Sequence, residues 1–300
     1  MTKSTNCESL ECIQPSERLQ ETLDAFLATA DRAAFARADP VSLVRRYDDP
    51  HDQEVAGFFV AMLAYGRVDS IRQKAGELLE RLGPRPAAQV DSGRAVRKLQ
   101  GFAYRFQKDD DLPRFARAVG RVRRERGSLG AAFLHDVQPR HGDYRHEMAA
   151  LMGQLRAAVA GPLTHGMKFL LPDPGSGSAA KRLCLFVRWM VRPEDGVDLG
   201  TWGRLGLSVD PARLLIPLDT HIARIGRYLG LTERRTDDLE AASQITRALG
   251  RLRPSDPVAY DLALCHLGIS GACPRRRDPV RCVGCPIRAV CRLGPEPAQW

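Results

Sequence analysis

The sequence predicts an all-α fold, and three observations support that prediction. Apolar residues recur at the helical spacing in one segment after another, beginning with Leu19, Leu23 and Phe26. The segment from Val55 to Leu63 is so densely apolar that we expect a buried core helix. Turns rich in proline, glycine and serine, of which residues 171–178 form the clearest, interrupt the helical pattern. A chain of 300 residues can bury a full core and can divide into two lobes around a cleft.

The expected helices follow one another along the chain. They cover residues 16–27, 41–44, 55–65, 68–82, 129–134, 144–159, 179–190, 219–230, 236–251 and 258–268. Residues 1–15 are expected to be disordered, and residues 84–90 are expected to be a connector. From Asp91 to Gly127 basic residues outnumber acidic ones eleven to five, with aromatic residues interleaved. We interpret this stretch as an exposed helical face whose aromatic side chains point into the core, with a phosphate-facing surface as the alternative.

The chain is basic, with 45 Lys and Arg residues against 36 Asp and Glu residues, a formal net charge of +9. This balance suits a polyanionic partner such as nucleic acid, although many soluble proteins are basic without binding one. No apolar run is long enough to cross a bilayer, and the polar N-terminal segment lacks the apolar core of a signal peptide. We therefore expect a cytoplasmic protein with no membrane partner.

Asp219 stands where an apolar segment meets an amphipathic helix. Ile222, Ile225 and Leu229 follow it at helical spacing, so we expect the helix to begin at Asp219 or Thr220. An Asp at this position caps free backbone N–H groups, and the positive end of the helix dipole favours its ionised form. Taken alone, the residue is explained by a helix cap, and a catalytic carboxylate is the second interpretation.

A turn at residues 171–178 runs directly into the helix that begins near Lys181. Gly175 and Gly177 permit a close backbone approach, and the helix N-terminus after Ser178 offers free N–H groups to a phosphate. Lys181 stands beside another cation at the positive end of that helix, where a partly desolvated lysine loses its proton more easily and becomes a nucleophile. A phosphate contact or a solvated surface lysine is the alternative.

Four of the eight cysteines lie in the last thirty residues, namely Cys273, Cys282, Cys285 and Cys291. In a reducing compartment such a group is more often a metal site than a disulfide framework. Four thiolates in one short loop can surround a single metal centre, and Cys-x2-Cys is a recurrent metal-binding spacing. The other four cysteines lack matching partners and are interpreted as free thiols or as core and helix-end residues.

These features resemble, in the same order, those of the helix-hairpin-helix (HhH-GPD) DNA glycosylase superfamily, to which endonuclease III and the adenine glycosylase belong. The run Pro-Leu-Asp-Thr-His at 217–221 is similar to the superfamily's Val-Asp-Thr-His signature. Its Asp is catalytic, so the resemblance implies a catalytic role for Asp219. Lys181 with Arg188 at the seventh following position resembles a pair in archaeal 8-oxoguanine glycosylases, which implies a Schiff-base lysine.

The turn at 171–178 resembles the superfamily's Leu-Pro-Gly-Val-Gly hairpin, although its loop differs in length. The resemblance implies that Gly175, Gly177 and Ser178 contact a DNA backbone. The segment FFVAMLAYGRVDSIRQKAGELL resembles the second and third helices of endonuclease III, between which a loop residue fills the gap left by a flipped base. This implies a DNA-binding role for Tyr65 or Arg67, with an ordinary helix-end aromatic as the alternative for Tyr65.

The cysteine loop resembles the C-terminal 4Fe-4S loop of endonuclease III, although eight residues instead of six separate its first two cysteines. The resemblance implies that Cys273, Cys282, Cys285 and Cys291 hold a structural 4Fe-4S cluster, with zinc as the alternative. Arginines surround this loop, where they can face phosphates.

Taken together, the resemblance covers residues 45–295 and implies a two-lobed, all-α fold of the HhH-GPD type with a C-terminal metal loop of four cysteines. One lobe is expected from 16–50 and 200–300, and the other from 51–199. The implied function is that of a monomeric, nucleoid-associated glycosylase that flips a damaged or mismatched base from double-stranded DNA, with the AP lyase step left open. A non-catalytic nucleic-acid-binding protein and a member acting on structured RNA are the alternatives.

Overall fold

The computed structural model describes residues 17–108, 110–135 and 142–294, and within these ranges it contains helices and no β-strand. The described chain is therefore all-α, as the sequence predicts. The N-terminal segment predicted to be disordered, residues 1–15, lies outside the described residues. In the described ranges no helix is long and apolar enough to cross a membrane.

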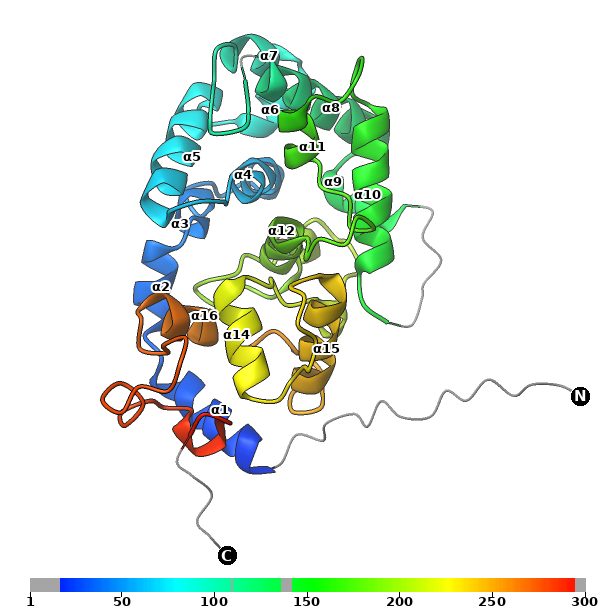
Figure 1. Ribbon diagram of the computed structural model, residues 1–300. Coiled ribbons are helices and arrows are strands. Elements are labelled where there is room, and N and C mark those ends of the chain that lie inside the picture. The colour runs from blue at the N-terminus through cyan, green and yellow to red at the C-terminus, as the bar shows by residue number, and fades with distance from the viewer. Residues whose placement is uncertain (1–16, 109, 136–141, 295–300) are drawn as a thin grey trace, which may run out of the picture.

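The helices follow in this order: α1 (Glu17–Thr29), α2 (Arg32–Ala38), α3 (Val41–Val44), α4 (Pro50–Met62), α5 (Val68–Leu82), α6 (Pro86–Asp91), α7 (Arg94–Lys98), α8 (Asp111–Arg126), α9 (Leu129–Leu134), α10 (Arg145–Ala157), α11 (His165–Leu170), α12 (Lys181–Val191), α13 (Thr201–Arg204), α14 (Thr220–Tyr228), α15 (Leu239–Gly250) and α16 (Asp261–Ile269). Two 3-10 helices, η1 (Pro211–Arg213) and η2 (Arg288–Val290), complete the set. Figure 1 shows α4 and α12 in the middle of the molecule, with α5 to α8 towards one end and α14 to α16 towards the other.

Helix α4 lies at the centre of the core, as its dense apolar sequence predicts. Asp49 caps it, with Oδ1 accepting from the N–H groups of His51 at 2.8 Å and Asp52 at 3.1 Å. Each residue from Asp52 to Met62 is buried. A Cβ added to Gly57 would lie 2.9 Å from Met190 Cε, so the small residue lets α4 approach α12 closely.

One hydrophobic cluster extends from Leu19 in α1 to Ile287 in the C-terminal loop. It includes residues from both of the predicted lobes, 16–50 with 200–300 and 51–199. This cluster does not separate the two predicted lobes, so the division into two lobes stays a prediction.

Two expectations for the segment after α5 need correction. The predicted connector at 84–90 contains most of α6, because Pro86 takes the first helical position, where its fixed φ and missing N–H are tolerated. The aromatic side chains of the following basic stretch point inward at Phe102, Tyr104 and Phe115, as expected, but Phe106 is 41% exposed.

Candidate active site

Asp219 is the residue that precedes the first turn of α14, within the predicted range. Its Oδ1 accepts hydrogen bonds from the backbone N–H groups of His221 at 2.8 Å and Ile222 at 2.9 Å. Its own backbone is extended, so the helix begins at Thr220. The cap is confirmed, and it occupies only one carboxylate oxygen, which leaves Oδ2 for other groups.

Lys181 is the first residue of α12, and its Nζ lies 3.5 Å from Asp219 Oδ2. The preceding Ala180 has a left-handed backbone with φ of 47°, which turns the chain from the hairpin into the helix. The lysine side chain is 39% exposed and the Asp219 side chain 14%. The structure therefore brings together two residues that the sequence singled out, an enclosed carboxylate and an amine open to solvent.

Cys265 makes a further side-chain contact with Asp219. It lies in α16, and its Sγ is 3.5 Å from Asp219 Oδ2. Burial, followed by the negative charges of Asp219 and Asp261, raises the pKa of this thiol well above its ordinary value of 9.0. The thiol therefore stays protonated near neutral pH and donates its S–H to the carboxylate.

The pKa of Asp219 lies below its ordinary value of 3.8. Burial acts in the opposite direction and is the largest single influence, but the Lys181 charge and the Ile222 N–H together with lesser contributions outweigh it. The carboxylate is accordingly ionised at neutral pH. It can accept a proton or stabilise a positive charge that develops beside it.

A cavity of about 380 Å³ opens beside Lys181. Its walls come from the loop between α4 and α5 and from the hairpin with the start of α12: Ala64, Tyr65, Gly66, Pro172, Ser178, Ala179, Ala180, Lys181 and Arg182. Its volume falls within the range of small-molecule sites. The two segments that the resemblance assigns to DNA thus face each other across one cavity.

Tyr65 forms a fixed part of the cavity wall. Its O–H donates to Gln107 Oε1, while the Tyr104 O–H donates to the Tyr65 carbonyl at 2.6 Å. The rings of Tyr104, Phe106 and Phe169 lie 4.6–6.0 Å from its ring centroid, and burial raises the pKa of Tyr65 to about 12. This packing favours the interpretation of Tyr65 as a helix-end aromatic.

Arg182 places a positive charge in the same wall. Its Cζ lies 4.3 Å from the ring centroid of Phe169 and 5.1 Å from that of Tyr65. It donates to the carbonyls of Met62, at 2.6 Å, and of Phe169. Burial lowers the pKa of its guanidinium to about 10, so the group remains charged at neutral pH. By contrast, Arg67 is exposed at the start of α5, and its side chain makes no cap hydrogen bond.

The hairpin residues Gly175, Gly177 and Ser178 are all exposed. The Gly175 N–H donates to Asp173 Oδ1 at 2.9 Å, and Gly177 has φ of 81°, a conformation that favours glycine. A second cavity, of about 380 Å³, is lined by Gly175 and Gly177 together with Arg145, His146 and Arg234 and with the acidic Asp238 and Glu240. Arg234 pairs with Asp238 and Arg145 with Glu240, so the two arginines close to the exposed hairpin backbone already have acidic partners.

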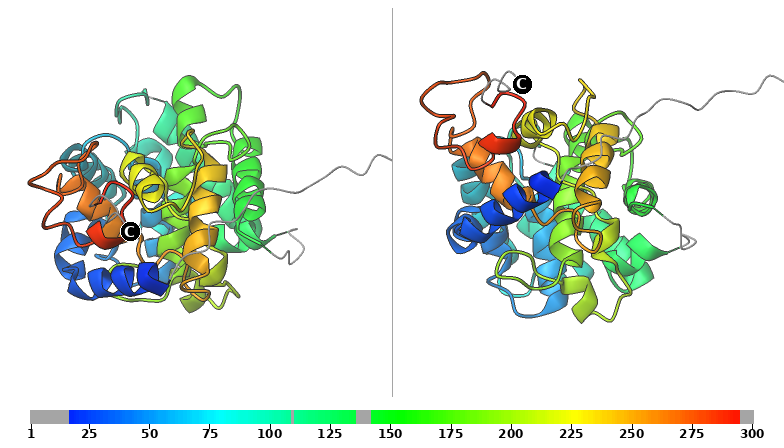
Figure 2. Two further views of the ribbon diagram at one scale, coloured as in Figure 1. Left: turned by 60° about the horizontal axis from the view of Figure 1, so that its bottom comes forward. Right: turned by 90° about the horizontal axis from the view of Figure 1, so that it is seen from below.

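The four cysteines occupy the loop after α16, which Figure 2 shows in orange and red beside the blue helices α1 and α2. Cys273 is buried and the other three are partly exposed. The Asp278 N–H donates to Cys282 Sγ at 3.5 Å. Burial raises the pKa of Cys285, and the thiols of Cys291 and Cys282 raise it further. Among the described residues no three His, Cys, Asp or Glu side chains are arranged to hold a metal ion.

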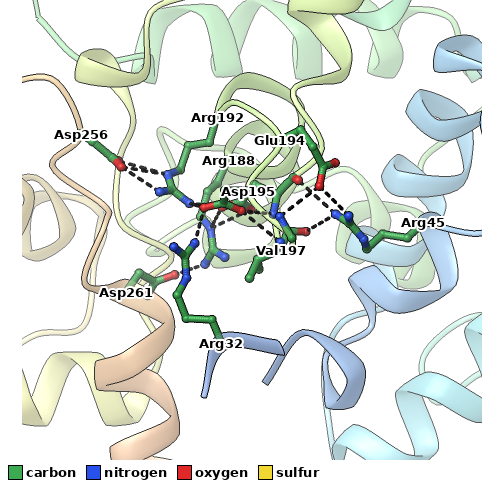
Figure 3. Close-up of polar contacts among 11 residues, drawn as sticks. Arg32, Arg45, Arg188, Arg192, Glu194, Asp195, Val197, Asp256 and Asp261 are labelled. Atoms are coloured by element: carbon green, nitrogen blue, oxygen red, sulfur yellow. Dashed lines mark hydrogen bonds and ion pairs between the residues drawn. The ribbon is translucent and has the colours of Figure 1, made fainter. Parts of the chain in front are cut away.

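Arg188, the second cation of the resemblance, lies in a buried network of ion pairs and not in the cavity. Its Nε donates to the carboxylate of Asp198 at 3.1 and 3.2 Å, and its Nη1 donates to Asp261. Arg192 joins the same network through Asp198. It also pairs with Asp256 at 2.7 Å, a contact that Figure 3 shows. Asp261 precedes Cys265 by one helical turn, so this network fixes the part of α16 that carries the thiol.

The sequence does not single out Cys265 or Arg182 as site residues. Their partners lie 46 positions away for the contact with Asp219 and 120 positions away for the contact with Met62. The one available signal for Cys265 is its spacing of four residues from Asp261, which places both on one face of a helix.

One comparison with known proteins gives a match, to a family model. The family model described as "Protein of unknown function (DUF2400)" matches residues 39–270, which include Lys181, Asp219 and Cys265 but not the four cysteines of the C-terminal loop. No curated protein and no solved structure gives a significant match. Because the match covers most of the sequence, this chain belongs to the DUF2400 family.

Proposed function

We propose that this protein is a DNA glycosylase with an HhH-GPD-type fold that removes a damaged base from duplex DNA and then cleaves the strand through a Schiff base on Lys181. The observation that carries the proposal is the 3.5 Å contact between Lys181 Nζ and Asp219 Oδ2 beside the cavity. An amine next to an ionised carboxylate is the pair that can attack an electrophilic sugar carbon and take up the released proton.

In the first step the base leaves with the electron pair of the glycosidic C–N bond, and positive charge develops on the deoxyribose. Asp219 faces this charge and stabilises it. After transferring a proton to the Asp219 carboxylate, Lys181 Nζ bonds to C1′. The C1′–O4′ bond then breaks as Asp219 gives its proton to O4′, which produces an iminium. The Asp219 carboxylate, ionised again, takes a C2′ proton, the 3′ phosphate leaves with the C3′–O3′ electron pair, and water hydrolyses the iminium to free the lysine.

Other parts of the site would hold the substrate. The exposed backbone at Gly175, Gly177 and Ser178 is available to a DNA phosphate. The cavity between the hairpin and the α4–α5 loop would receive the flipped base, with Tyr65 and Arg182 in its wall. Arg67, exposed at the end of that loop where α5 begins, is the better candidate for filling the gap in the duplex, because Tyr65 is held in its aromatic cluster.

The cap geometry of Asp219 favours a second candidate, a nucleic-acid-binding protein without catalysis. In that case Oδ1 caps α14, and Lys181 serves as a phosphate contact near the hairpin. Both candidates predict DNA binding that weakens with salt. They differ in chemistry, which a trapping experiment tests directly.

Borohydride reduction should trap wild-type protein covalently on one duplex in a panel that carries 8-oxoguanine, oxidised pyrimidines, uracil, alkylated bases or abasic sites. The Lys181→Ala protein should form no adduct, because borohydride reduces only the iminium that the lysine amine forms. Denaturing gel electrophoresis measures the adduct, and quantified base release on the same duplexes gives the glycosylase step separately.

Lys168 in α11 supplies the control, since it is a lysine on the helix before the hairpin and does not line the cavity. The Lys168→Ala protein should form the adduct as wild type does. Base release without any adduct would show that Lys181 does not act as a nucleophile and that the enzyme is a monofunctional glycosylase. If wild type neither releases a base nor forms an adduct, the binding protein becomes the better interpretation.

We further propose that Cys273, Cys282, Cys285 and Cys291 hold a 4Fe-4S cluster, with zinc as the alternative. Thiols are the ligands that such clusters use, and the Asp278 N–H already donates to Cys282 Sγ, as N–H groups do around clusters. Arg224 donates to the Cys273 carbonyl at 2.9 Å, while its buried Nε has no partner in the described part of the chain. An anionic cluster beside Cys273 would supply the acceptor that this donor lacks.

When bound, the cluster would contribute folding free energy and fix the shape of the loop. Purified protein should therefore show a brown colour with iron and acid-labile sulfide on analysis. Cys285→Ala should lose the metal and lower the melting temperature, whereas Cys184→Ala, which removes a thiol buried in the main core, should keep its full metal content. A colourless protein that contains zinc would exclude the iron-sulfur assignment. A wild-type protein without metal, whose melting temperature the Cys285→Ala substitution leaves unchanged, would exclude both metals.

A further inference from the structure

A large cavity lies on the described surface where α6, α7 and α8 meet. Figure 1 shows these three helices at the end of the molecule away from α14 to α16. Its volume is about 730 Å³, and it is lined by Val90, Asp91, Ser92, Gly93, Val96, Arg97, Gln100, Arg117 and Arg124. It shares no lining residue with the cavity beside Lys181. This is a separate feature, and the proposed glycosylase reaction makes no use of it.

The lining of the cavity carries more positive than negative charge, with three arginines, Arg97, Arg117 and Arg124, against one acidic residue, Asp91. Asp91 accepts from the buried Arg123 through both carboxylate oxygens, at 2.9 Å to Nε and 3.1 Å to Nη2. The Asp91 carbonyl accepts from Arg124 Nη1 at 2.8 Å, which holds that guanidinium at the rim. Arg123 is 3% exposed and also pairs with the buried Glu54, so Arg123, Asp91 and Glu54 together carry one negative charge, which compensates at most one of the three lining arginines.

The side chains of Arg97 and Arg117 have no hydrogen bond or ion pair within the part of the chain that the structure describes. Arg117 and Arg124 are seven residues apart on α8 and so lie on one face of that helix. Arg97 reaches the same cavity from α7. Three guanidinium groups therefore converge on one cavity, two of them with all their donors available to a ligand.

The geometry points to a binding site for a phosphate-bearing anion in this cavity. Guanidinium groups recognise phosphate through paired N–H donors, and three of them suit a ligand with two or more phosphate groups better than a single carboxylate. The phosphates can belong to a nucleic-acid backbone that continues across α8 or to a free polyphosphate compound. Of the two interpretations that the basic sequence from Asp91 to Gly127 allows, this cavity favours the phosphate-facing one.

The inference is tested with the full chain and two probes, inorganic tripolyphosphate and a lesion-free DNA duplex. The double variant Arg97→Ala, Arg117→Ala should bind tripolyphosphate about tenfold more weakly than wild type by isothermal titration calorimetry, since it loses two charge-assisted contacts. Both side chains are exposed and unpaired in the described structure, so the fold should be retained, and a circular-dichroism melt checks this.

Arg121→Ala is the matched control, because Arg121 lies on α8, is exposed, pairs with Glu125 and does not line the cavity. The double variant is compared with wild type for the slope of its DNA-binding constant against salt concentration on logarithmic axes. If the double variant also binds DNA more weakly and this slope falls by about two, the phosphates belong to the DNA backbone. If only tripolyphosphate binding falls, the ligand is a free polyphosphate. If the double variant binds both probes as tightly as the control does, the inference is overturned, and neither probe depends on base excision.

Discussion

Asp219→Asn should lower the rate of base release by about 10²–10⁴-fold while leaving the fold intact. Asparagine is as good a helix cap as aspartate, so its side-chain oxygen can keep the hydrogen bonds from His221 and Ile222. It carries no charge, however, and it cannot take a proton from Lys181. Single-turnover base release on the duplex identified by trapping measures the loss.

Asp49→Asn is a close control for this substitution. Asp49 caps α4 in the same manner, with Oδ1 accepting from the N–H groups of His51 at 2.8 Å and Asp52 at 3.1 Å, but it is exposed and lines neither the cavity beside Lys181 nor the cavity at the hairpin. It should change base release by less than about twofold, because asparagine keeps the cap and no site residue is altered. Equal losses in both variants would show that Asp219 acts as a cap alone.

The pH dependence gives a second measurement of the same carboxylate. Because folding lowers the pKa of Asp219 below its ordinary value of 3.8, the ionised form persists as pH falls through the usual carboxyl range. Activity and the stability contributed by Asp219 should both be lost only as pH falls through that lowered pKa. The acid limb of kcat/KM should thus lie below the usual carboxyl range, and the asparagine variant should lack it.

The parts of the fold that the sequence predicts are those set by local signals. The start of α14 follows from Asp219 and the periodic apolar residues after it, and the buried position of α4 follows from its composition. The proximity of Lys181 and Asp219 was implied by resemblance alone, since nothing in the spacing of the two residues requires it. In the structure the left-handed backbone at Ala180 brings Lys181 to Asp219. The sequence does not predict this turn, because alanine rarely adopts a left-handed conformation.

The parts that the sequence does not predict are contacts between segments far apart in the chain. Apart from its four-residue spacing from Asp261, Cys265 carries no pattern that distinguishes a core cysteine from one that donates to a carboxylate. The same is true of Glu54, which lies in the apolar α4 and is 0% exposed. Burying this carboxylate costs little free energy only because hydrogen-bond and ionic partners from other helices surround it. The sequence of α4 does not indicate these partners.

Glu54→Ala should destabilise the protein by about 3–5 kcal/mol. Glu54 Oε1 accepts from the Gly130 N–H and from Trp202 Nε1, both at 2.8 Å, and Oε2 accepts from the Leu129 N–H at 2.9 Å. Oε2 also pairs with the buried Arg123. The substitution leaves three buried donors without their acceptor and Arg123 with Asp91 as its remaining ionic partner, and it opens a cavity between α4, α9 and α13. Equilibrium unfolding in urea measures the change.

Glu125→Ala provides the comparison, since Glu125 forms an ion pair with Arg121 on the surface of α8, with side chains 53% and 58% exposed. That substitution should cost no more than about 1 kcal/mol, because water screens and replaces an exposed pair. The contrast separates the loss of a buried acceptor from the loss of a negative charge. If the two variants unfold at the same urea concentration, the four contacts of Glu54 do not stabilise the packing of α9 and Trp202 against α4, and the core must be held by its apolar residues alone.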